Sequence, residues 1–68
     1  MNIVKAAAIF KNINDPRFTV DEKRAAIRAV TDLNKEDRER IGISYLDVTR
    51  ARIWLKHFMI TGKNTIEG

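Results

Sequence analysis

The chain has 68 residues, with 13 Lys and Arg against nine Asp and Glu, a formal net charge of +4 and no Cys. This length suffices for one domain only, and a core of that size contributes at most ~3–5 kcal/mol, which favours a dimer or a bound partner. Disulfides and thiolate metal ligands are excluded, and no apolar run is long enough to span a membrane. Lys5 and Lys11 interrupt the apolar N-terminal residues, a pattern untypical of signal peptides, so we expect a cytoplasmic protein.

Apolar residues recur at helical spacing in three segments, which predicts an all-α fold with residues 1–62 as a single domain. The first helix is expected over residues 2–13. Its apolar stripe consists of Ile3, Ala6, Ala7, Phe10 and Ile13. The helix should end before Pro16, because proline disfavours helical geometry in the residue that precedes it.

A second helix is expected over residues 20–33. Thr19 stands at its N-cap, and Glu22 follows at the spacing of a capping box. Its buried stripe should consist of Val20, Ala26, Ile27, Val30 and Leu33, and its solvent face of Lys23, Arg24, Arg28 and Thr31.

Residues 34–42 form the most polar part of the chain. Asn34 can cap a short helix that Gly42 ends, with Ile41 as its apolar anchor, and an ordered loop fits the same residues. The predicted fold is therefore a small domain of three principal helices, with a short polar helical turn before the last and longest one. Residues 63–68 are expected to form a flexible tail.

The last helix should begin after Ser44 and end at Gly62, which are good N-terminal and C-terminal capping residues. Its apolar residues form two stripes. The larger stripe consists of Val48, Ala51, Trp54, Leu55, Phe58 and Met59, and the smaller one of Leu46, Ile53 and Ile60. Because both faces need to be covered, this helix is either the central element or carries an oligomer interface. We expect Leu46, Ile53 and Ile60 to form the interface of a homo-oligomer.

Catalytic patterns are lacking in the sequence. His57 is the single histidine, so no histidine pair can hold a metal, and it is expected at the edge of a helix face. The three glycines do not form a phosphate-binding loop. We therefore expect a protein that is not an enzyme and has no cofactor, although scattered residues can in principle form a catalytic triad.

The segment Gly42-Ile43-Ser44-Tyr45-Leu46-Asp47-Val48-Thr49-Arg50 resembles the turn and recognition helix of helix-turn-helix repressors of the lactose-repressor type. The resemblance implies that Gly42 takes the left-handed conformation between two helices, that Ile43 and Val48 pack inward, and that the following helix binds DNA. Upstream the match ends, because Asp37 and Arg38 stand where that family has small or apolar residues. A plain helix stop followed by a helix start explains the same residues.

On the DNA-binding interpretation, Tyr45 and Arg50 approach the bases, while Arg40, Arg52 and Lys56 hold phosphates. The full set of candidate DNA-binding residues is Arg40, Ser44, Tyr45, Thr49, Arg50, Arg52 and Lys56. One small module binds DNA weakly, which again favours a dimer.

A broader pattern resembles short helical proteins encoded by phages and prophages of Firmicutes. It runs from Ile3 through Phe10, Phe18 and Ala26 to Ile43 and Trp54. This resemblance implies a small regulatory or accessory protein and assigns no site residue. The leading prediction is a non-enzymatic DNA-binding regulator of phage type that uses the helix beginning at Ser44. The alternative is an accessory or anti-defence protein that binds a host protein or an anionic nucleotide signal.

Overall fold

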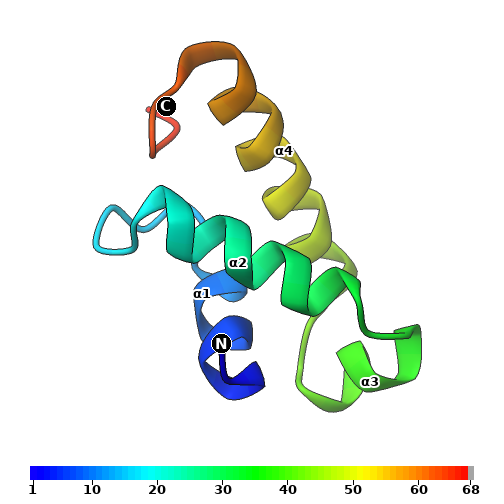
Figure 1. The fold of residues 1–68 in the computed structure, drawn as a ribbon. Helices are drawn as coiled ribbons and strands as arrows, with labels where there is room; N and C mark the ends of the chain where they lie inside the picture. Colours follow the sequence, from blue (N-terminus) through cyan, green and yellow to red (C-terminus); the bar gives the residue numbers. More distant parts are fainter. Residues whose placement is uncertain (68) are drawn as a thin grey trace.

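A computed structural model describes residues 1–67 of the chain (Figure 1). Within these residues the regular structure is entirely helical, which confirms the all-α prediction. The elements are α1 (Ile3–Lys11), α2 (Val20–Thr31), α3 (Lys35–Arg40) and α4 (Tyr45–Thr61). The segment left open between a short helix and a loop is helical, and α4 is the longest helix.

Local capping chemistry sets where the helices begin. The capping box of Thr19 and Glu22 is present at the start of α2, and a second box pairs Ser44 with Asp47 at the start of α4. The Asn34 side chain accepts a hydrogen bond from the Asp37 main-chain N–H at 2.8 Å and so caps α3. These short-range bonds satisfy main-chain donors that no helix can satisfy internally.

The core is built where α4 crosses the pair formed by α1 and α2 (Figure 1). Trp54 and Phe10 are its largest fully buried apolar side chains. The Trp54 ring stacks on Phe58 at 5.6 Å between centroids, and Val48, Ala51 and Leu55 of the larger apolar stripe of α4 pack in the same core. The prediction was wrong for Met59, which is 77% exposed. The remaining buried members of this core cluster are Ala7, Ile13, Val30 and Ile43. The Cα radius of gyration, 11.2 Å, is close to the ~11 Å typical of a compact chain of this length.

The prediction that Lys23 faces solvent was wrong, because its side chain is completely buried. Its ammonium donates a hydrogen bond to the Asn64 main-chain carbonyl at 3.0 Å and lies 5.3 Å from the centre of the Trp54 ring. Lys23 precedes Ala26, Ile27 and Val30 by three, four and seven residues, so its position belongs to the buried stripe. Its charge concealed this periodicity.

The segment after α4 returns to the connection between α1 and α2, and these contacts were missed by sequence reasoning. The Asn64 carbonyl also accepts a hydrogen bond from the Trp54 indole N–H at 2.6 Å, and the Asn64 side chain donates to the Phe18 carbonyl at 2.8 Å. Asn14 and Ile66 exchange two further bonds, at 2.7 and 3.1 Å. Of the expected flexible tail, Asn64 and Ile66 thus have defined contacts, and residue 68 lies outside the described residues.

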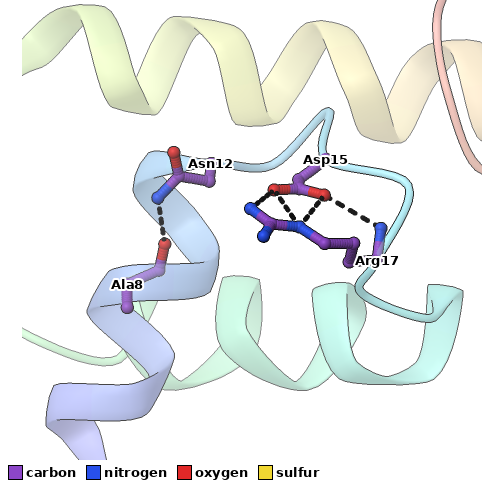
Figure 2. A network of polar contacts seen from close by, with 4 residues as sticks. All are labelled: Ala8, Asn12, Asp15 and Arg17. Carbon is purple, nitrogen blue, oxygen red and sulfur yellow. Dashed lines mark hydrogen bonds and ion pairs between the residues drawn. The ribbon is translucent and has the colours of Figure 1, made fainter.

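The connection between α1 and α2 is itself held by local polar contacts (Figure 2). The Asn12 side chain donates to the Ala8 carbonyl at 2.9 Å, which closes the end of α1. Arg17 pairs with Asp15 through two guanidinium nitrogens, the shortest contact being 2.6 Å. This guanidinium holds the pKa of Asp15 at about 2, well below its ordinary value, so the carboxylate stays ionised at neutral pH.

Candidate nucleic-acid interface

The turn between α3 and α4 has the geometry that the sequence predicts. Gly42 takes a left-handed φ of 81°, which L side chains rarely adopt. The Ile43 main-chain N–H donates to the Arg38 carbonyl at 2.9 Å and closes the turn. Ile43 is buried in the core, and Ile41 and Val48 pack against it. The turn is therefore held against the core by these apolar side chains, while Ser44 and Tyr45 at the start of α4 are exposed.

One outward face of α4 gathers four of the predicted DNA-binding residues. At 100° per residue, Tyr45, Thr49, Arg52 and Lys56 fall within a sector of about 60°. Tyr45 is 85% exposed, and Arg52 and Lys56 are exposed as well. The Thr49 hydroxyl donates to the Tyr45 carbonyl at 3.1 Å, so its hydrogen is used within the helix. This face combines an exposed aromatic ring with two cations.

Two basic residues of α3 join this face, and sequence reasoning did not include them. Lys35 and Arg38 line a shallow groove between α3 and α4 together with Tyr45 and Arg52. Glu39 is the acidic residue that lines it. The sequence did carry a signal, since Lys35 and Arg38 are three residues apart and so share one side of a helix. We call Lys35, Arg38, Tyr45 and Arg52 the α3–α4 basic groove.

The cations of this groove are not neutralised by neighbouring acids. Within residues 1–67 the ion pairs are Arg17 with Asp15 and Arg40 with Asp37. No carboxylate in that range therefore lies within 4.0 Å of the Lys35, Arg38 or Arg52 charge. The groove presents three cations against one carboxylate, a surplus that attracts an anion.

Two of the predicted DNA-binding residues lie away from both this groove and the outward face of α4. Arg50 is exposed, but on α4 it points about 160° away from Arg52, because two residues of helix turn the side chain by ~200°. Arg40, at the end of α3, lies 3.6 Å from Asp37 and does not line the groove. Arg50 and Arg52 therefore lie on two different surfaces of α4.

The smaller apolar stripe of α4 lies in the open. Leu46 and Ile53 are each 54% exposed and Ile60 is 74% exposed, and Met59 beside them is also exposed. Because no other element within residues 1–67 covers the stripe, it is available to a partner. The homo-oligomer expected there stays a prediction.

The part of the chain that the structure describes contains no cluster of metal-binding side chains. No three His, Asp or Glu side chains within residues 1–67 lie close enough together to hold a metal ion. His57 is half-buried, with its Nδ1 3.4 Å from the Thr61 hydroxyl of the same helix. None of the helices in this range has the length and apolar character required to cross a membrane.

Comparison with known proteins adds no relative to this description. No protein family matches the chain, and neither a curated protein nor a solved structure is detectably similar to it. The class of protein is therefore defined by its fold, a small all-α domain with a glycine turn between a short helix and a long one.

Proposed function

We propose that this protein is a small, non-enzymatic DNA-binding regulator, of the kind encoded by phages, and that it binds duplex DNA at the α3–α4 basic groove. The observation that carries the proposal is the placement of Lys35, Arg38 and Arg52 around the exposed start of α4, without acidic partners within residues 1–67. Unpaired cations at an exposed surface are the groups that displace counterions from a phosphate backbone.

The turn supports a docking mode in which the start of α4 enters the major groove. Gly42 and Ile43 hold this helix end at the surface, with the Tyr45 ring projecting from its first turn. The major groove of B-DNA is wide enough to admit one α-helix. In this mode Tyr45 contacts base edges or sugars, while Arg52 and Lys56 on the same face reach the phosphates.

Salt dependence gives a quantitative test of this mode. Four phosphate contacts, by Lys35, Arg38, Arg52 and Lys56, predict that the logarithm of the binding constant falls with the logarithm of salt concentration at a slope of about −3 to −4. The measurement is fluorescence anisotropy of a labelled 20-base-pair duplex, of a length chosen to be about two helical turns, titrated at several salt concentrations. The Arg52→Ala variant should bind more weakly and reduce the slope by about 0.9.

A matched control separates this site from general positive charge. Arg24 is an exposed cation of α2 that does not line the groove, so Arg24→Ala removes the same charge elsewhere. Tyr45→Ala should weaken binding while leaving the salt slope unchanged, because the phenol makes no ionic contact. Equal losses for Arg24→Ala and Arg52→Ala would show that binding follows net charge, and the proposal would then fail.

A further inference from the structure

A second concave surface lies on the opposite side of α4 from the basic groove. It is a groove of about 430 Å³ between the end of α1, the middle of α4 and the returning C-terminal segment. Its apolar lining comes from Ile13, Ile53, Trp54 and Ile66. Pockets of ~300–1,000 Å³ accept small ligands or single anchoring side chains. We call this surface the α1–α4 groove.

The charges at its edge are mainly positive. Lys11 and Arg50 line the groove and are exposed. Asp15 also lines it, but its carboxylate is bound by Arg17, as Figure 2 shows. The Asp15 charge is therefore offset within the loop, and Lys11 and Arg50 determine what the groove attracts.

The exposed apolar stripe of Leu46, Ile53 and Ile60 continues from this groove along α4, with Ile53 belonging to both. Because its apolar residues recur once in every seven positions, the stripe is a narrow seam, of the kind that pairs with another helix. Arg50 borders it on one side and Lys56 on the other, at about 50–60° from Ile53. The seam is apolar in the centre and cationic at both margins.

A second copy of this chain, the partner that the sequence predicts for this stripe, fits such a seam poorly. In an antiparallel pair centred on Ile53, each margin of the seam carries the same cation from both copies, Arg50 on one side and Lys56 on the other. In a parallel pair Lys56, three residues after Ile53, occupies the second core position of the heptad and faces Lys56 of the second copy. Either arrangement brings like charges together, which disfavours self-association.

We propose that the α1–α4 groove and the adjoining stripe dock an acidic amphipathic helix of a partner protein. Its apolar side chains would lie along Leu46, Ile53 and Ile60, with one anchored in the groove, and its carboxylates would lie against Lys11, Arg50 and Lys56. This is recognition of a helix by an apolar surface, with charge complementarity choosing the partner. The inference goes beyond DNA binding, because the α1–α4 groove and the apolar stripe lie on a different face of α4 from Tyr45 and Arg52. Lys56 lies between the two faces and is shared by both proposals.

The test uses a defined probe, a fluorescein-labelled helical peptide of about four turns with Leu at helical spacing and Glu on both margins. Anisotropy measures its binding to the full chain. Arg50→Glu should weaken binding about tenfold, since it replaces an attraction by a repulsion. Ile53→Asp should weaken binding by at least as much. Ile53 is half-exposed, and Arg50 is exposed, so neither substitution reaches the buried core.

Controls distinguish this site from the basic groove. Arg24→Glu carries the same charge change on α2 and should bind the peptide like the parent chain. Arg52→Ala should weaken DNA binding but leave peptide binding unchanged, so failure of one proposal is separable from failure of the other. A peptide with Lys in place of Glu should not bind.

Three outcomes would overturn the inference. Equal weakening of binding by Arg50→Glu and Arg24→Glu would indicate attraction to net charge alone. Sedimentation equilibrium of the parent chain could reveal a dimer that Ile53→Asp dissociates, which would place a second copy on the stripe. Amide chemical-shift changes on peptide addition could fall on Lys35 and Arg38 in place of Ile53 and Ile66, which would assign the peptide to the basic groove.

Discussion

At the scale of single residues, Lys23 shows how one buried cation is accommodated. Its ammonium has a carbonyl acceptor in Asn64 and the face of Trp54 beside it, and the two contacts replace part of the lost hydration. Burial nevertheless lowers the pKa of Lys23 below its ordinary value of 10.5, with the more distant Asp15 charge opposing the shift. The side chain thus fixes the C-terminal segment and imposes an electrostatic cost on folding.

This shift predicts a rise of stability with pH. Between the lowered pKa of folded Lys23 and the ordinary value near 10.5, the unfolded chain binds more protons than the folded chain. The free energy of unfolding should therefore increase as the pH rises through the interval just below 10.5. Urea unfolding of the parent and of Lys23→Met, followed by the emission of Trp54 over this interval, measures the effect.

In Lys23→Met the part of the increase in the free energy of unfolding that comes from the Lys23 ammonium should disappear, because Met has no proton to bind. Lys63→Met is the matched control, since Lys63 is an exposed neighbour of the same segment, and it should retain the increase. A difference in stability between parent and Lys23→Met that stays constant with pH would contradict the assignment.

Residues of this kind mark the limit of what hydropathy predicts. Sequence reasoning placed Trp54, Ile43 and Val48 toward the core, and the structure confirms this. It misplaced Lys23, because the partner that makes burial tolerable is a carbonyl 41 residues away in the chain. Long-range acceptors of this type have no local signature.

At the scale of elements, the capped starts of α2 and α4 and the glycine end of α4 were the most predictable features. Ser44 and Gly62 bound α4 as expected, and Thr19 begins α2. The first helix is shorter than expected, Ile3–Lys11 in place of residues 2–13. Because capping hydrogen bonds join residues that are close in sequence, capping residues can be recognised from the sequence without knowledge of the fold. The grouping of Lys35 and Arg38 with Arg52 depends on how α3 and α4 meet, which no local pattern records.

The two glycines that end helices give a matched pair of substitutions. Gly42 and Gly62 have φ values of 81° and 71°. A side chain at either position is strained by about 1–2 kcal/mol. At Gly42 an added Cβ would in addition lie 2.8 Å from the Lys11 ammonium nitrogen, whereas nothing lies within 4 Å at Gly62. Gly42→Ala should therefore destabilise the fold at least as much as Gly62→Ala.

Urea unfolding monitored by circular dichroism measures this difference in the free energy of unfolding. The Lys11→Ala change, introduced into both variants, should alter this difference little, because the Lys11 ammonium ends a flexible side chain that can move away from the new Cβ. If Gly42→Ala is as stable as the parent chain, the left-handed turn between α3 and α4 is wrong.

At the scale of the whole molecule, burial is distributed unevenly. The buried contacts join α1, α2 and the middle of α4, while α3 has no buried residue and is held by the isoleucines that follow it. Sequence periodicity predicted the helices and which faces are apolar. It did not predict that the C-terminal segment would return across Trp54, since residues 63–67 lack an apolar repeat.

This distribution predicts the order of amide hydrogen exchange. Protection should be greatest in α1, α2 and around Trp54, and least in α3, because local opening is easiest where little apolar surface is lost. Exchange followed by NMR at neutral pH resolves the individual amides. Duplex DNA added to the sample should slow exchange in α3 if Lys35 and Arg38 bind phosphate, and unchanged exchange there would count against their role.

The hydrogen bonds of the Asn64 carbonyl have a practical consequence. One main-chain oxygen accepts both the Trp54 indole proton and the Lys23 ammonium proton. Proteolytic clipping after Gly62 would remove that oxygen and leave an ammonium and an indole to be hydrated where the segment had covered them. The segment of residues 63–67 is therefore a sensitive place for cleavage or for attaching a label, even though it belongs to no helix.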